Sequence, residues 1–127
     1  MNIEKYYRIE VKENEQLIVI RVLGAWSLDA VIQYNQDLLA TIKKLNHQNG
    51  FSILYDTTQG SILSEEVSAK IMEVVPELER LGLKKTALVI ISAIIRMQAT
   101  RLIKESALSE KTQYFASEEE ALGWLAP

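Results

Sequence analysis

The feature that most constrains this chain is a repeated alternation between short apolar runs and longer segments in which apolar residues recur with helical spacing. The first two runs, Tyr6–Val11 and Leu17–Leu23, are separated only by the polar turn Lys12–Glu15, which predicts an antiparallel hairpin. Every later run follows a helix-length segment, as in β-α-β units with parallel strands. The later runs are Phe51–Tyr55, Thr86–Ile91 and Thr112–Phe115.

Serine residues mark the start of each predicted helix, because a serine hydroxyl readily accepts a hydrogen bond from a free N–H of the first turn. The second helix contains Pro76, which lacks a backbone donor and should kink or split it. Gly82 should end that helix, and the pair Asn49-Gly50 is a turn signal before the third strand. The four predicted N-caps are Ser27, Ser64, Ser92 and Ser117.

The resulting order, ββαβαβαβα, predicts an α/β fold with a mostly parallel five-stranded sheet, an N-terminal antiparallel hairpin and about four helices. The length of 127 residues fits a single domain over residues 1–127. The run Ala87–Ile91 is the most continuously apolar, which is typical of an interior strand with helices on both faces. Asp56 and Ser92, which follow two of the strands, should lie at the same edge of the sheet.

The composition excludes several classes of site and partner. The chain has no cysteine, which excludes disulfides, thiolate metal ligands and thiol catalysis and fits a reducing compartment. The net charge is −3 and neither half is basic, so no nucleic-acid partner is expected. The sequence has no apolar run of transmembrane length, and Met1–Lys5 is not the start of a signal peptide. We therefore expect a cytoplasmic protein without an integral membrane segment.

The titratable residues do not form a recognisable catalytic or metal-binding set. His47 is the only histidine and lies in a polar stretch without further ligands, which indicates an exposed loop residue. Glu118–Glu120 follow Ser117, and acidic residues in a first helical turn are explained by the helix dipole. Phosphate-binding glycine motifs and the serine-hydrolase and zinc-protease motifs are also missing from the sequence. We therefore expect no enzyme activity, no cofactor and no metal.

Two stretches resemble the SpoIIAA-like domains of the STAS (anti-sigma-factor antagonist) family. In Leu88–Ser92 a buried strand stops at a serine and a helix follows at once. Gln113–Leu125 combines a short strand ending in an aromatic residue, an acidic capped turn and a closing Trp-Leu pair. The resemblance implies the fold predicted above and a non-enzymatic regulatory or protein-interaction module with a protein partner.

The resemblance also implies a possible regulatory site, because STAS antagonists are switched by phosphorylation of a Ser or Thr in an Asp-x-Ser type motif after a strand. The similar stretch here is Asp56-Thr57-Thr58, which makes Thr58 the candidate phospho-acceptor, with Ser61 nearby. The match departs from the family at Gln59, where a glycine is usual. A phosphate would add about −1.5 to −2 charges beside Asp56 and disturb docking to a partner.

Ligands of open α/β sheets bind at the carboxyl edge of the strands, where helix N-termini present free N–H groups. The sequence predicts a loop site at this edge, with Asp56–Ser61 as its polar loop. The alternative is structural, because Ser27 and Ser92 could serve only as caps and Asp56 could simply end a strand. The candidate residues are Gly24, Trp26, Ser27, Asp56, Thr57, Thr58, Ser61 and Ser92.

The predicted third helix offers a second candidate surface. Arg96, Thr100 and Lys104 recur at i, i+4 and i+8, with Arg101 nearby, so they share one stripe of the helix. This face could dock an acidic protein or an anionic headgroup, and it could equally be a solvated surface without a partner.

Two further expectations concern apolar and aromatic residues. The second and third helices are rich in Ile, Val, Leu and Met, including Met72 and Met97, which allows an alternative function as a small hydrophobic ligand or lipid-binding domain. Ordinary core packing explains the same pattern. Trp26, Tyr6 and Tyr7 are expected to be partly exposed, which favours a homodimer, since aromatic residues are enriched at interfaces.

Overall fold

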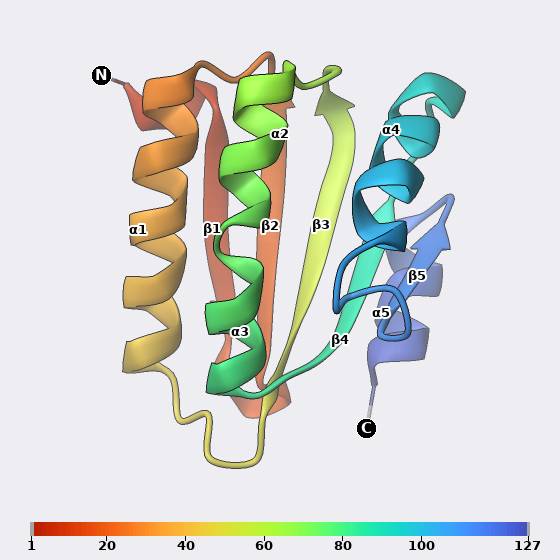
Figure 1. Ribbon diagram of the computed structural model, residues 1–127. Helices are drawn as coiled ribbons and strands as arrows, with labels where there is room; N and C mark the ends of the chain where they lie inside the picture. Colours follow the sequence, from red (N-terminus) through yellow and green to blue (C-terminus); the bar gives the residue numbers. More distant parts are fainter. Residues whose placement is uncertain (1, 127) are drawn as a thin grey trace.

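In the computed structural model, which describes residues 2–126, five strands form one mixed sheet in the order β1-β2-β3-β4-β5 (Figure 1). β1 and β2 are antiparallel, and each later neighbouring pair is parallel. The predicted hairpin and the mostly parallel five-stranded sheet are therefore confirmed. The strands are β1 (Tyr7–Lys12), β2 (Leu17–Gly24), β3 (Phe51–Gly60), β4 (Leu83–Val89) and β5 (Thr112–Phe115).

Within residues 2–126, five α-helices accompany the sheet, together with two short 3-10 helices, η1 (Ile3–Lys5) and η2 (Glu13–Glu15). The second predicted helix is split near Pro76, as expected, so four predicted helical segments become five helices. Pro76 lies in the first turn of α3, where its missing N–H removes no helical hydrogen bond. The helices are α1 (Leu28–Lys44), α2 (Glu65–Met72), α3 (Val75–Leu81), α4 (Ala93–Lys104) and α5 (Glu118–Leu125).

The helices form two unequal layers (Figure 1). α1 to α4 cover one face of the sheet, where residues such as Ile18, Ile20 and Ile53 form the larger core. α5 packs over β3, β4 and β5 on the opposite face, where Leu54 meets Ala121 in a smaller core. Alternating strand residues thus supply both cores. Every helix within residues 2–126 is too short or too polar to span a bilayer.

β4 is an interior strand between β3 and β5, as the run Ala87–Ile91 predicted. Leu88 faces the larger core, while Ala87 and Val89 face the smaller one, so helices cover both sides of this strand. The predicted extent was wrong at its end. The strand stops at Val89, and the side chain of Ile91 is 70% exposed.

Candidate functional site

The stretch predicted as a polar loop, Asp56–Ser61, is mostly strand, because β3 continues to Gly60. The last residues of β3 pair with the end of β2 after a shift in register, and this pairing extends the strand beyond its apolar part. The threonines of this stretch suit the conformation, since β-branched side chains favour extended backbone. The loop prediction was therefore wrong, and the connection to α2 is short, from Ser61 to the N-cap Ser64.

The carboxyl ends of β2, β3 and β4 meet at one edge of the sheet, as predicted (Figure 1). Gly24 at the end of β2 pairs with Gly60 at the end of β3. Asp56 pairs with Val89, the last residue of β4, and Ser92 follows three residues later. The backbone therefore brings the candidate residues to a common edge.

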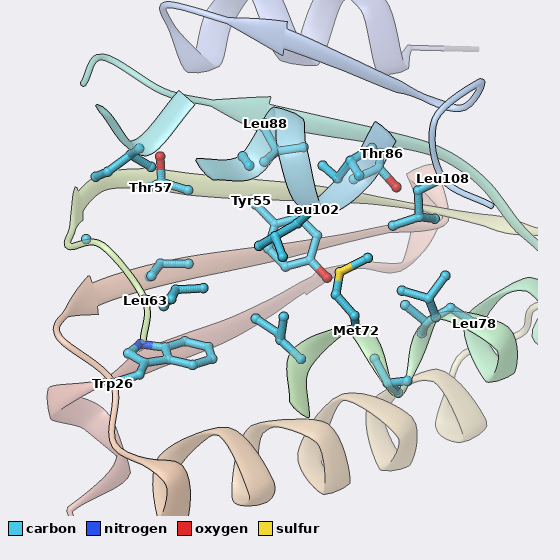
Figure 2. A pocket seen from close by; sticks show the side chains of 18 of the residues that line it. Trp26, Tyr55, Thr57, Leu63, Met72, Leu78, Thr86, Leu88, Leu102 and Leu108 are labelled. Atoms are coloured by element: carbon cyan, nitrogen blue, oxygen red, sulfur yellow. The ribbon is translucent and has the colours of Figure 1, made fainter. Parts of the chain in front are cut away.

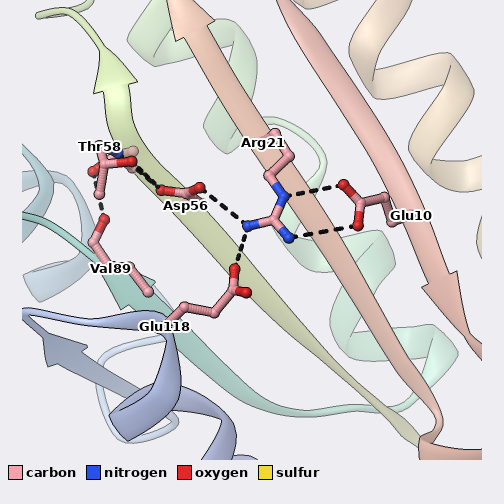
Figure 3. Close-up of polar contacts among 7 residues, drawn as sticks. Glu10, Arg21, Asp56, Thr58, Val89 and Glu118 are labelled. Carbon is pink, nitrogen blue, oxygen red and sulfur yellow. Dashed lines mark hydrogen bonds and ion pairs between the residues drawn. The ribbon is translucent and has the colours of Figure 1, made fainter.

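The candidate side chains nevertheless divide between the two faces of the sheet, because successive strand residues point in opposite directions. Asp56 and Thr58 lie on the face of α5 and contact each other (Figure 3). Thr57 borders the interior on the side of α2 to α4. Its hydroxyl donates a hydrogen bond to the carbonyl oxygen of Val89 at 2.8 Å and so links β3 to β4.

Thr58 is an exposed residue in a defined hydrogen-bonding arrangement. Its hydroxyl donates to Oδ1 of Asp56 at 2.7 Å, and its backbone N–H donates to the same oxygen at 3.0 Å. Asp56 therefore fixes the orientation of the Thr58 hydroxyl while leaving it at the surface. Of the two neighbouring threonines, Thr58 is the exposed one, because the Thr57 hydroxyl is bound within the sheet.

Arg21 is the centre of a charged cluster on the same face (Figure 3). Its Nη1 lies 3.1 Å from Oδ2 of Asp56, and its Nε lies 3.0 Å from Oε2 of Glu10. A third carboxylate, that of Glu118, also forms an ion pair with Nη1. These hydrogen bonds raise the pKa of Arg21, and the bond that Arg21 donates to Glu118 contributes most. One guanidinium thus balances three carboxylates, and a further negative charge here would have no cation of its own in the cluster.

The pKa of Asp56 lies below the ordinary value of an aspartate. Burial by itself raises this pKa, but the hydrogen bonds from Thr58 and from Arg21 stabilise the ionised carboxylate and outweigh burial. Since the unfolded chain binds the proton more tightly, the ionised Asp56 stabilises the fold above the unfolded pKa. This contribution is lost as the pH falls below about 4 and through the folded pKa.

We therefore expect Asp56→Asn to be less stable than the wild type by about 0.5–1 kcal/mol at neutral pH, because a partly exposed ion pair is lost. The difference should shrink as the pH falls from about 4 through the lowered pKa of folded Asp56, where the wild-type carboxylate becomes protonated. Urea denaturation at neutral and acidic pH measures both values. Glu110→Gln, which removes an exposed carboxylate in the turn before β5, is the control and should show neither effect. A constant difference at every pH would contradict the assigned role of Asp56.

The two candidate serines serve as helix caps. The hydroxyl of Ser27 accepts from the N–H of Ala30 at 3.2 Å, and the hydroxyl of Ser92 accepts from the N–H of Ile95 at 3.3 Å. Both serines therefore satisfy first-turn donors, as the structural alternative predicted. Ser61 is exposed and begins the connection between β3 and α2.

Trp26 is a core residue, so the expectation that it is partly exposed was wrong. Its side chain packs against Tyr7 and Tyr34, with ring centroids 5.6 Å and 4.9 Å away. Its indole N–H donates to the carbonyl oxygen of Tyr6 at 2.6 Å. Tyr7 is also buried, whereas Tyr6 is half-buried. Trp26 and Tyr7 therefore do not support a homodimer.

Sequence reasoning missed an exposed apolar surface at the same edge of the sheet. We call Ile62, Ile91, Ile94 and Met97 the edge patch; these side chains are 52%, 70%, 61% and 72% exposed. Ile91 lies two residues beyond Val89, just before α4. Ile94 and Met97 of α4 follow at intervals of three residues, on one side of the helix. Met97 had been predicted to face the interior, so the patch corrects that assignment.

Gln98 holds Ile62, the remaining member of the edge patch, beside α4. Its side-chain amide donates to the carbonyl oxygen of Leu63 at 2.7 Å and accepts from the N–H of Leu63 at 2.9 Å. Ile62, the residue before Leu63, is thereby held beside α4. The β3–α2 connection, which carries Ile62, is thus tied to α4, which carries Ile94 and Met97.

The predicted basic face of α4 is exposed along its length, at Arg96, Thr100, Arg101 and Lys104. The guanidinium of Arg96 lies 5.2 Å from the centroid of the Tyr114 ring, which partly anchors it. His47 lies in a loop, as predicted, but it is half-buried rather than exposed, and its Nδ1 lies 3.0 Å from the carbonyl oxygen of Leu45.

Glu118 does more than start a helix, because it joins the charged cluster around Arg21. Its position in the first turn of α5 had been explained by the helix dipole alone. The capping role belongs to Ser117, whose hydroxyl accepts from the N–H of Glu120 at 3.2 Å. The acidic turn therefore also fastens α5 to the sheet.

No protein-family model and no curated protein matches this sequence. Solved structures do match its fold. The anti-sigma factor antagonist SpoIIAA in its unphosphorylated form has a TM-score of 0.66 at 20% identity, covering 94% of this chain and 96% of that chain. Bacillus SpoIIAA in the phosphorylated form has a TM-score of 0.63 at 24% identity, covering 94% and 98%. An uncharacterized DUF3478-family protein with a SpoIIAA-like fold, from Shewanella loihica PV-4, has a TM-score of 0.71 at 16% identity, covering 94% and 92%. At these identities the likeness concerns the fold.

Proposed function

Because the chain has the SpoIIAA-like (STAS) fold, we propose that it is a non-enzymatic regulatory module that docks a protein partner at the carboxyl edge of its sheet. The partner is of the class that anti-sigma factor antagonists act on, namely an anti-sigma factor. Phosphorylation of Thr58 weakens the docking. Residues 1–127 act as one domain in the cytoplasm, where ATP is available to a separate kinase.

The observation that carries the proposal is the edge patch. Four large apolar side chains that are each more than half exposed form the kind of surface that marks protein interaction sites. Thr58 lies at the same edge of the sheet as the patch. Ile91 is two residues beyond Val89, and Val89 is the β4 partner of Asp56, which binds the Thr58 hydroxyl.

The charged cluster explains how a phosphate would act. A phosphate ester at Thr58 removes the hydroxyl hydrogen and with it the hydrogen bond that Asp56 accepts. It also places about −1.5 to −2 charges beside that carboxylate. Arg21 already balances three carboxylates, so it could bind the phosphate only by weakening its bonds to them. The end of β3 would rearrange, and the apolar patch beside it would acquire a strongly hydrated neighbour. Both effects oppose docking.

The alternative sources of partner affinity are the basic stripe of α4 and the edge patch itself. A stripe-driven interaction would depend strongly on ionic strength, because exposed charges are screened by salt. An interaction through the edge patch would depend mainly on apolar burial. The basic stripe of Arg96, Thr100, Arg101 and Lys104 therefore serves in this proposal as an accessory face for acidic residues of the partner.

The test uses a partner that is captured on the wild-type chain, identified and purified, with affinities then measured by calorimetry. Ile94→Asp should weaken binding at least 30-fold, since it places an unpaired charge in a buried apolar contact. Val11→Asp, on the edge strand β1, is the matched control and should bind normally; Val11 is 41% exposed. Thr58→Glu should weaken binding at least tenfold, and Thr58→Gln, of the same shape without the charge, much less.

Wild-type affinity in both Ile94→Asp and Thr58→Glu would refute docking at this edge. Equal losses in Thr58→Glu and Thr58→Gln would refute the charge-based switch while leaving the docking surface in place. Circular dichroism and denaturation curves of each variant separate lost binding from lost folding.

A further inference from the structure

An internal cavity of about 120 Å³ lies between the sheet and helices α2, α3 and α4 (Figure 2). Side chains from all of these elements surround it, including Met72, Leu78, Leu88 and Leu102. The lining is almost entirely hydrocarbon, and within residues 2–126 none of the lining residues carries a charge. An ionised ligand group would therefore be buried without a partner, which is strongly unfavourable.

One lining residue has a buried hydroxyl group that this apolar cavity leaves without a hydrogen bond. Thr86, on β4, is 1% exposed, and its Oγ1 has no hydrogen-bond partner within residues 2–126. Three other hydroxyl residues line the cavity: Tyr55 and Thr57 already have partners, and Ser61 is exposed to solvent. The hydroxyl of Tyr55 lies 2.8 Å from that of Tyr34, and the hydroxyl of Thr57 binds Val89.

The unpaired hydroxyl of Thr86 is not explained by folding alone. A buried polar group without a hydrogen bond destabilises the protein, and valine has nearly the same shape without this penalty. A single water molecule does not resolve the problem, because a buried water needs two to four polar partners. The residue is explained if a ligand pairs with it.

The cavity has a route to the surface beside the edge patch. Ser61, which lines the cavity, is exposed, and Leu63 is half-buried. Ile95 and Ala99 of α4 line the same side of the cavity, and Gln98 between them holds Leu63 through two hydrogen bonds. Entry therefore passes between the β3–α2 connection and α4, where one amide side chain joins the two walls.

We propose that this cavity binds a small, neutral and largely apolar molecule whose single hydrogen-bonding group pairs with the hydroxyl of Thr86. The volume is somewhat smaller than the roughly 150 Å³ of an engineered apolar cavity that takes up benzene. It therefore suits a one-ring aromatic alcohol or a short-chain alcohol rather than a whole lipid. This inference goes beyond partner docking and does not depend on it.

The test compares three one-ring probes on the purified full chain by two-dimensional NMR titration. Phenol should bind, with shifts concentrated around β4 and α4, and benzoate should not bind because its charge would be buried unpaired. Toluene has the same ring but no hydrogen-bonding group. Thr86→Val should weaken phenol binding about tenfold, the loss of one hydrogen bond, and change toluene binding less than about twofold.

Two further measurements keep the result interpretable. Thr86→Val should melt at the same temperature as the wild type or a few degrees higher, because it removes an unpaired buried group. Ala99→Leu, which adds volume at the α4 wall, should weaken phenol and toluene together at least tenfold. Failure of phenol to bind, or equal weakening of phenol and toluene by Thr86→Val, would overturn the assignment and leave an apolar void only. Docking would remain untouched by that result, because its test concerns Ile94 and Thr58.

Discussion

Replacing Trp26 by alanine is expected to lower the free energy of unfolding by about 3–5 kcal/mol. Trp26 is only 7% exposed and packs against the rings of Tyr7 and Tyr34, so its removal leaves a large hole in the main core. It also leaves the carbonyl oxygen of Tyr6 without the indole N–H that it accepts at 2.6 Å. Urea denaturation followed by far-ultraviolet circular dichroism measures the loss.

Trp26→Phe separates the two contributions to this loss. Phenylalanine keeps an aromatic ring in the cluster but lacks the N–H, so we expect a smaller loss of about 1–2 kcal/mol. A loss below about 0.5 kcal/mol in Trp26→Ala would contradict the placement of this residue in the core. Because Trp26 acts through stability, its variants do not report on partner docking, although the sequence had placed it among the candidate site residues.

The parts of this fold that the sequence predicted depend on local chemistry. Ser27 and Ser92 accept first-turn hydrogen bonds as their positions indicated, and Pro76 divides a helix because it cannot donate one. Strand runs were equally visible, since apolar β-branched residues mark buried strands wherever they occur. These features need only a few neighbouring residues and no knowledge of the rest of the chain.

The parts that the sequence did not reveal depend on residues far apart in the chain. Arg21 meets Glu10, Asp56 and Glu118 only after three strands and α5 have assembled, and no spacing rule connects those positions. The end of β3 was mistaken for a loop for the same reason. Its extended form comes from pairing with β2, and its polar composition gave the opposite indication.

The exposed face of helix α4 could be predicted from the sequence only in part. Its sequence carries two apolar stripes, one with Ile95 and Ala99 and the other with Ile94 and Met97, and helical periodicity fits either stripe to the core. The structure turns the first stripe inward and leaves the second exposed. The second stripe continues through Ile91 at the same spacing of three residues, and that surplus of apolar residues was the available signal for the edge patch.

Gly50→Ala is expected to destabilise the protein by about 3 kcal/mol, through backbone strain and a steric clash. Gly50 has a φ of +88°, which side chains with a Cβ rarely adopt. A Cβ at this position would lie 2.9 Å from the carbonyl oxygen of Gly82, which is backbone and accepts a hydrogen bond from Phe51 at 3.1 Å. Chemical denaturation measures the total effect.

Gly82→Ala is the matched control, because Gly82 also has a positive φ, +106°, but its added Cβ would meet nothing closer than 3.4 Å. It should therefore lose only about 1–2 kcal/mol, the cost of strain without the clash. Amide exchange at Phe51 should accelerate more in Gly50→Ala than in Gly82→Ala, since only the first displaces the carbonyl that binds it. Equal effects of the two substitutions would contradict this, because they would mean that the starts of β3 and β4 can move apart and relieve the clash without a cost in stability. The sequence marked each glycine as a local turn or helix end, whereas their shared close approach sets the spacing of two central strands.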